Sequence, residues 1–332
     1  MSDRNEFWRI YEISKGGFPI PTLSPESRGR KGPAGVFLEG DGRIGLFWRI
    51  LLGWLAFVSG LGLAVAAATI AGNYGFPALA LQVILAVVTT GVSVPLIYLL
   101  RRYADRRPWS GLGLSSPPKG LPYFLLGIGL LALLTAASLL IGSLLGWLRV
   151  VAFHLPASTL FIILINSAIA FFYEAFPEEI SFRGYLYRNL NTRFPRWLAL
   201  VLQVALFVLA PIALTALMVL AGIATWDQVT VDYIINLVAF GTMLQLCRIL
   251  SGNLWMNIGF HLAWLEMVRY VVVPSPSAIV EVEYITPLAG YLVNIGTVIL
   301  GVIILLAWSL RQRVNWNRIE PDDQPEPEHP AI

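Results

Sequence analysis

Residues 176–188 read FPEEISFRGYLYR and follow a long apolar run over residues 160–176. Two adjacent carboxylates at the end of an apolar segment of membrane length are costly to bury, so they demand a physical reason. On a helix, Glu179 and Arg183 are four residues apart and can form an ion pair. Glu178 points about 100° away from Glu179 and stays free. The spacing fits a paired structural acid beside a reactive one, and it also fits a charged helix end at the membrane surface.

The composition indicates a polytopic membrane protein. Of the 332 residues, 57% are hydrophobic and 13% are charged, whereas soluble domains contain roughly 25% charged residues. The net charge is +3, and the basic residues form no stripe of the kind that binds nucleic acid. Cys247 is the single cysteine, so no internal disulfide is expected.

Eight apolar ranges predict an all-α membrane bundle of about eight transmembrane helices. Each range is long enough to cross a hydrocarbon core of roughly 30 Å. We expect a polar N-terminal segment at residues 1–44, a transmembrane helical domain at 45–310 and an acidic, proline-containing tail at 311–332. The expected spans cover residues 46–70, 77–100, 121–148, 157–176 (with one acid, Glu174), 197–223, 231–250, 254–273 and 288–310.

Basic residues alternate between the connecting loops. They gather before the first span, between the second and third, between the fourth and fifth, and after the eighth. The positive-inside rule then predicts that both termini are cytoplasmic. We expect the protein to lie in the plasma or inner membrane. The pair Glu178–Glu179 is expected at the cytoplasmic face, and His261 about two turns into the seventh span.

His261 is the second candidate for chemistry. A lone imidazole in a membrane helix is often a packed residue bonded to a neighbouring helix, and that reading stays open. If His261 and Glu178 meet at one depth, they can position and activate a water molecule between them. His154 and His329 fall outside the expected spans. A two-histidine, one-glutamate metal site requires a second imidazole, so we do not expect a bound metal, and the sequence indicates no particular cofactor.

The motif residues resemble those of the CPBP intramembrane proteases, also called the Abi or CAAX prenyl protease type II family. Residues 178–186 are similar to the family's Glu-Glu-x-x-x-Arg motif. Residues 251–261 are similar to the run that leads to its last histidine. Residues 106–114 resemble the linker that often precedes the family core, so the resemblance covers about residues 105–270.

The resemblance implies roles for four residues. Glu178 would activate the attacking water, Glu179 and Arg183 would form the supporting pair, and His261 would be the last family histidine. Although the family is often labelled as metalloproteases, the single imidazole argues against a metal here.

Two other family positions differ. Proline replaces a histidine at Pro211, and leucine replaces an asparagine at Leu265. Glu266 is adjacent to Leu265 but points about 100° away. Losing one oxyanion donor typically costs ~10²–10³ in rate, so slow or absent activity is expected. The amides that could substitute are Gln203, Gln245 or Asn257.

Two functions of different class follow. The first is an intramembrane endopeptidase of the CAAX-processing class, which acts on a membrane-associated peptide or protein within the lipid bilayer. The second is a catalytically impaired relative that binds a membrane partner or acts as a scaffold. A transporter is less favoured, because the unusual polar residues lie toward one membrane face rather than at the midplane. Neither of the two leading functions involves nucleic acid.

Overall fold

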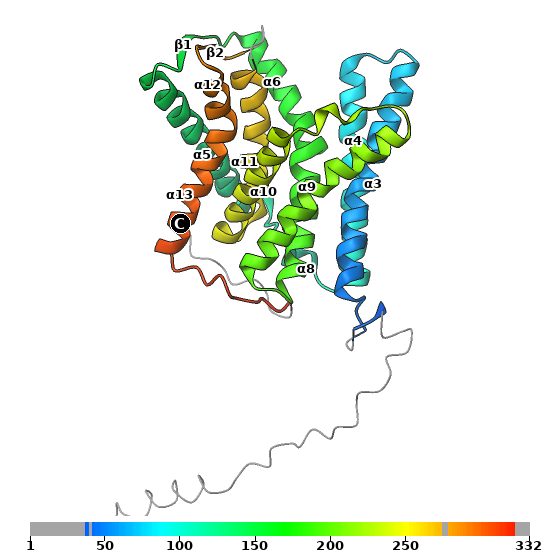
Figure 1. The fold of residues 1–332 in the computed structure, drawn as a ribbon. Helices are drawn as coiled ribbons and strands as arrows, with labels where there is room; N and C mark the ends of the chain where they lie inside the picture. Colours follow the sequence, from blue (N-terminus) through cyan, green and yellow to red (C-terminus); the bar gives the residue numbers. More distant parts are fainter. Residues whose placement is uncertain (1–36, 40–41, 274–277, 323–332) are drawn as a thin grey trace, which may run out of the picture. The chain divides into compact units, whose positions relative to one another are not determined.

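Long apolar helices make up nearly all of the computed structural model, which describes residues 37–39, 42–273 and 278–322 (Figure 1). In this described part, seven helices are long and apolar enough to cross a membrane. The protein is therefore an all-α polytopic integral membrane protein. These seven helical runs cover Leu46–Asn73, Ala78–Ala104, Trp109–Leu144, Thr159–Asn191, Arg196–Leu220, Val231–Ser251 and Pro287–Arg311.

The helices and strands follow one another in a simple order. Several π-helical segments continue their α-helices, so that neighbouring labels often belong to one run. The elements are α3 Leu46–Asn73, α4 Ala78–Leu99, α5 Pro117–Leu144, β1 Leu148–Phe153, α6 Ala157–Ala170, α7 Phe176–Glu179, α8 Tyr187–Asn191, α9 Arg196–Leu220, α10 Val231–Ser251, α11 Leu254–Met267, β2 Val280–Tyr284, α12 Pro287–Tyr291 and α13 Thr297–Arg311. The π-helical segments are η1 Leu100–Ala104, η3 Phe171–Ala175, η4 Ile180–Leu186, η6 Val268–Val272 and η7 Leu292–Gly296.

The seventh expected span, at residues 254–273, differs from the other seven. It is helical from Leu254 through Val272, as α11 followed by η6. It contains Asn257, His261 and Glu266 and is not among the seven most apolar helices. It still packs inside the bundle, because its residues from Asn257 to His261 are buried. Its polar residues lower its mean hydropathy, and two of them, Asn257 and His261, are buried inside the bundle.

The fourth run is longer than the sequence predicted. We expected it to end near Phe176, with Glu178 and Glu179 at the membrane surface. In the structure the run continues through α7, η4 and α8 to Asn191. The two carboxylates therefore lie in the interior of a 33-residue span rather than at its end.

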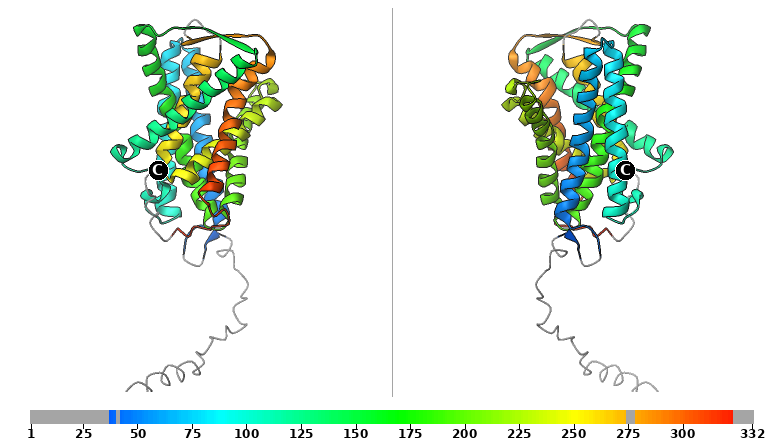
Figure 2. Two further views of the ribbon diagram at one scale, coloured as in Figure 1. Left: turned by 90° about the vertical axis from the view of Figure 1, so that its left-hand side faces the viewer. Right: turned by 90° about the vertical axis from the view of Figure 1, so that its right-hand side faces the viewer.

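A short antiparallel sheet closes the end of the bundle that lies opposite α8 (Figure 1). Strand β1 follows α5 and pairs with β2, from Leu148 opposite Tyr284 to Phe153 opposite Val280. The views in Figure 2 show the same two strands above the helix ends. The sheet therefore ties the loop after α5 to the loop after the α11 run.

The opposite end is held by charged residues. The Arg101 guanidinium donates to both oxygens of Asp322, at 2.6 and 3.0 Å, and also to Asp105. Arg188 donates to Asp322 from its Nε atom at 3.2 Å. The side chains of Arg101, Arg188 and Asp322 are nearly fully buried. Asp322 therefore connects the chain after α13 to α8 and to the end of the α4 run.

Backbone hydrogen bonds continue this attachment. The amide of Trp197 donates to Trp316, and the amide of Arg196 donates to Arg318. The amide of Glu320 donates to the carbonyl of Asn191. The segment between α13 and Asp322 thus pairs with the turn between α8 and α9, so this part of the expected tail is bound to the bundle. Residues 323–332 of that tail lie outside the described residues, as does most of the N-terminal segment expected at 1–44.

Replacing Asp322 tests this attachment. Asp322→Ala should lower the free energy of unfolding by about 3–5 kcal/mol, because it removes the carboxylate that two buried guanidinium groups share. Thermal unfolding of the purified protein in detergent measures the effect. Asp227→Ala is the matched control, because Asp227 is exposed and bonds the nearby Thr225. An unchanged melting temperature for Asp322→Ala would contradict the attachment.

The pH dependence of stability should reveal the part played by Glu320. Burial opposes its charged form, but Arg196, Arg318 and Arg188 outweigh burial and lower its pKa below the ordinary 4.5. A carboxyl with a lowered folded pKa stabilises the fold above its unfolded pKa, and this contribution is lost as pH falls through the folded value. The wild type should therefore lose more melting temperature than Glu320→Gln between pH 6 and pH 3. Parallel curves for the two proteins would contradict this assignment.

Candidate active site

The predicted ion pair is present in the bundle interior. Arg183 donates from Nη1 to Glu179 Oε1 at 3.0 Å, and neither side chain is exposed to solvent. The guanidinium also lies 4.3 Å from the centre of the Phe207 ring and donates to the Gly241 carbonyl. A buried cation needs such compensation, because removing it from water costs several kcal/mol. Glu179, Phe207 and Gly241 together hold Arg183 between α7, α9 and α10.

His261 is bonded to the same carboxylate oxygen. Its Nδ1 atom lies 2.9 Å from Glu179 Oε1, and the side chain is almost fully buried. A carboxylate that accepts from Nδ1–H fixes the tautomer of the ring and leaves Nε2 as the acceptor. The sequence predicted that His261 and Glu178 meet at one depth, but it did not predict this hydrogen bond from His261 to Glu179.

Glu178 and His261 line one cavity of about 180 Å³. Its apolar walls come from four spans, and its polar groups come from the α6–α8 run, α10 and α11. Glu178 lines the cavity. Glu179 does not line it but is hydrogen-bonded to His261, which does. The remaining lining residues are Phe57, Leu61, Glu174, Phe182, Phe207, Ala210, Pro211, Tyr233, Asn236, Leu237, Phe240 and Trp264.

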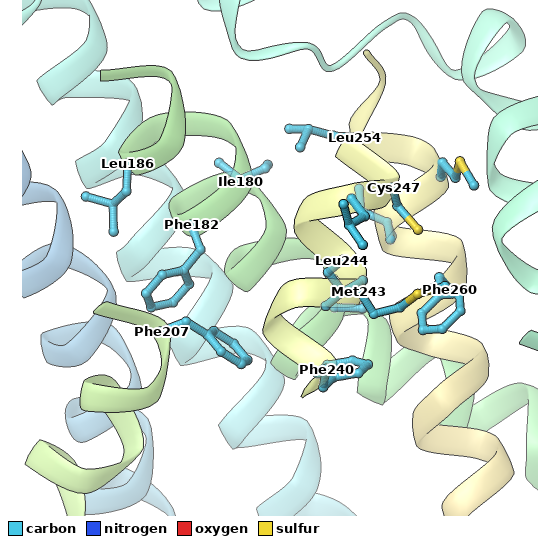
Figure 3. Close-up of a cluster of buried hydrophobic side chains, with 14 of the residues drawn as sticks. Ile180, Phe182, Leu186, Phe207, Phe240, Met243, Leu244, Cys247, Leu254 and Phe260 are labelled. Atoms are coloured by element: carbon cyan, nitrogen blue, oxygen red, sulfur yellow. The ribbon is translucent and has the colours of Figure 1, made fainter. Parts of the chain in front are cut away.

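Aromatic side chains build the floor of the cavity. Figure 3 shows Phe182, Phe207 and Phe240 projecting from three different helices into one region of the core. The Phe207 ring packs edge-on against Phe182, with centroids 5.3 Å apart. The Phe240 ring packs against His261 at 4.9 Å and against Trp264 at 4.4 Å. This edge-on packing adds a second contact to the imidazole beside its hydrogen bond to Glu179.

Local helix geometry presents the acids to the cavity. Pro177 has no N–H and cannot donate to the carbonyl four residues earlier, which disturbs the α-helical ladder. The preceding residues Phe171–Ala175 are π-helical, and the amide of Phe176 donates to Phe171. Such π-helical insertions are frequent at functional sites. Both Glu174 and Glu178 line the cavity across this insertion.

A sharp turn between α10 and α11 positions His261. Gly252 ends α10 with φ of 67°, a conformation that favours glycine. Asn253 then caps α11 by accepting a hydrogen bond from the amide of Trp255 at 3.0 Å. The run at residues 251–255 that resembled a family motif is therefore a helix–turn–helix junction. It starts α11 about two turns before His261.

Two glycines allow α11 to approach α5 closely. A Cβ atom on Gly259 would lie 2.1 Å from the carbonyl oxygen of Phe124, and one on Gly127 would lie 2.2 Å from that of Met256. Small residues at helix contacts permit this backbone-to-backbone packing in membranes. The contact fixes α11, and with it His261, against α5.

The two residues that differ from the family pattern, Pro211 and Leu265, lie in different places relative to the cavity. Pro211 lines the cavity, whereas Leu265 does not, and the neighbouring Trp264 lines it instead. The amides that the sequence analysis named as substitutes also lie elsewhere. Gln203, Gln245 and Asn257 are fully buried but are not cavity-lining residues, and Asn257 donates to the carbonyl of Leu244.

Three polar residues of the cavity were not among the site residues predicted from the sequence. They are Tyr233 and Asn236 on α10 and Trp264 on α11. The signal was available, because Tyr233, Asn236 and Phe240 follow one another at intervals of three and four residues and so share a helix face. The indole Nε1 of Trp264 and the amide oxygen of Asn236 are enclosed without a hydrogen-bond partner among the described residues.

The donor set does not fit a structural or catalytic zinc site. Within the described ranges, no group of three or more His, Cys, Asp or Glu side chains is close enough together to hold a metal ion. Catalytic zinc sites commonly use three protein ligands. Nδ1 of the one imidazole at this site is already bonded to Glu179.

Removing Arg183 tests the buried pair. Arg183→Ala should destabilise the protein by about 3–5 kcal/mol, because it leaves Glu179 buried without its guanidinium partner. Thermal unfolding in detergent measures the change. Arg269→Ala is the control, because Arg269 is 45% exposed and pairs with Glu266 on the same helix. Equal melting temperatures for the two variants would count against a structural role for the pair.

Comparison with known families adds one finding. A family model described as type II CAAX prenyl endopeptidase Rce1-like matches residues 158–265, roughly a third of the chain. The matched range runs from α6 into α11 and contains Glu178, Glu179, Arg183 and His261. It is narrower than the range of about 105–270 that the motifs had indicated. No match to the chain was found among curated proteins or among solved structures.

Proposed function

We propose that this integral membrane protein, whose residues 158–265 are an Rce1-like domain of the CPBP family, hydrolyses peptide bonds in a membrane-associated peptide or protein. The observation that carries the proposal is the cavity inside the bundle, which Glu178 and His261 line together. The family description supports substrates of the CAAX-processing class. The positive-inside rule supports an orientation with the α8 end, and both termini, in the cytoplasm.

In this mechanism Glu178 is the general base. It takes a proton from a water molecule in the cavity, and the water oxygen attacks the scissile carbonyl carbon. His261 orients the water through Nε2, because its Nδ1 atom is bonded to Glu179. Arg183 donates a hydrogen bond to Glu179 and holds it in place. General-base assistance of this kind typically contributes ~10²–10⁴ in rate.

The size of the cavity limits what it can hold. At about 180 Å³, it is smaller than the ~300–1,000 Å³ typical of small-molecule sites. It accommodates the scissile bond and one neighbouring side chain rather than a folded substrate. The substrate segment must therefore be extended where it enters the bundle.

A second candidate function is a catalytically impaired relative that binds a membrane peptide or acts as a scaffold. The observation that favours it is Pro211, which lines the cavity at the position aligned with a family histidine. A proline side chain neither donates nor accepts a hydrogen bond. Binding without hydrolysis would use the same cavity.

Substitutions at Glu178 and His261 separate these functions. Glu178→Gln preserves shape and removes the base, so it should abolish cleavage, and His261→Ala should do the same by releasing the water. Loss of a general base typically lowers the rate by ~10²–10⁴. The assay uses purified protein in lipid vesicles with a prenylated CAAX peptide and a panel of other membrane-anchored peptides. Glu281→Gln, on the exposed strand β2, is the control.

Three results would decide the outcome. Cleavage by the wild type that is lost in both variants supports the peptidase. Cleavage that survives Glu178→Gln contradicts the assigned base. Peptide binding without cleavage by the wild type favours the impaired relative.

A further inference from the structure

Glu174 is a second carboxylate in the cavity and has no part in the mechanism described above. It lies four residues before Glu178 in the same helical run, and both side chains line the same space of about 180 Å³. The π-helical segment Phe171–Ala175 contains Glu174, and Pro177 follows it directly in the next turn. An acid inside a membrane span is costly and needs a function or a partner.

Peptide hydrolysis requires an acid as well as a base. An amide nitrogen is a poor leaving group unless it gains a proton as the carbon–nitrogen bond breaks. Glu178 begins the cycle ionised, in order to accept the proton of water. Nδ1 of His261 is committed to Glu179, and Pro211 has no proton to give. Of the two carboxyl side chains lining this cavity, Glu174 is the one that can carry a proton from the start of the cycle.

We propose that Glu174 is the general acid, which protonates the leaving amine in the peptide hydrolysis proposed above. The water oxygen bonds to the carbonyl carbon while its proton moves to Glu178. The carbon–nitrogen bond then breaks while the carboxylic proton of Glu174 moves to the nitrogen. Transfer of the proton from Glu178 back to Glu174 restores the starting state, and the sum is amide plus water giving acid plus amine.

The surroundings favour this division of roles. Two carboxylates in one small, apolar-walled cavity repel each other, so the pair favours holding a single proton. The cationic Arg183 pairs with Glu179, the residue next to Glu178, so along the helical run its positive charge is nearer to Glu178 than to Glu174. A proton shared between two carboxyl groups supplies one base and one acid in the same state.

A purely structural role for Glu174 predicts a different behaviour. If Glu174 only shaped the cavity, its loss would slow cleavage of every substrate to a similar degree. A general acid acts on the leaving group alone. Its loss should therefore harm substrates with poor leaving groups and spare those whose leaving group departs without a proton.

The experiment compares two bonds in one substrate. The first probe is a prenylated CAAX peptide with its normal amide, and the second is the same peptide with a thioester at the scissile position. Glu174→Gln should lower kcat for the amide by ~10²–10⁴ and for the thioester by less than roughly tenfold. Glu174→Asp should recover part of the amide activity.

Glu266→Gln is the matched control. Glu266 is also an acid within a membrane helix, but it lines a different, larger pocket on the other side of α11. This control should cleave both probes at wild-type rates, and thermal unfolding of each variant should show that it is folded.

The outcomes distinguish this inference from the proposed function. If the wild type and Glu174→Gln cleave the amide equally while Glu178→Gln is inactive, Glu174 is not the acid and the peptidase stands. If Glu174→Gln slows amide and thioester by the same factor, its role is structural and the inference fails. If the wild type cleaves neither probe nor any other membrane-anchored peptide, both the peptidase and the acid are overturned.

Discussion

The buried carboxylate of Glu179 is the interaction on which the interior of this bundle depends. One of its oxygens accepts hydrogen bonds from both Arg183 and His261. A single charge therefore joins the α6–α8 run to α11, and Arg183 extends the connection to α9 through Phe207 and to α10 through Gly241. Because an unpaired charge at this depth is very unfavourable, the bundle favours the arrangement of these helices that brings Arg183 and His261 to Glu179.

The same constraint gives the acids of this helical run different environments. Glu179 is fully enclosed and is occupied by its two partners, whereas Glu174 and Glu178 face the cavity. Three acids within six residues thus have two different environments. The difference comes from the helix period and from the π-helical insertion before Pro177, which together set the direction in which each carboxyl points.

A second set of charges stabilises the end of the bundle that carries α8. There Arg101 and Arg188 share Asp322, and Asp105 is bonded by Arg101, Tyr185 and Asn189. Tyr185 and Asn189 belong to the same helical run as Glu178. The segment after α13 is therefore connected to the run that supplies the acids of the cavity, so the fold of this end and the geometry of the site are coupled.

The sequence by itself determined the class of the protein and the pair that anchors it. Apolar ranges of membrane length give helices because lipid leaves backbone groups no other partners, and a spacing of four residues puts Arg183 next to Glu179. The tertiary structure decided what lies across from these residues. Helix spacing says nothing about which faces of two helices meet, so the cavity residues Tyr233, Asn236 and Trp264 were missed. The hydrogen bond between His261 and Glu179 was missed for the same reason. Hydropathy also stopped the fourth span at Phe176, since it scores charged residues as though they faced water or lipid. Only the packed bundle supplies the partners that let the helix continue through its charges to Asn191.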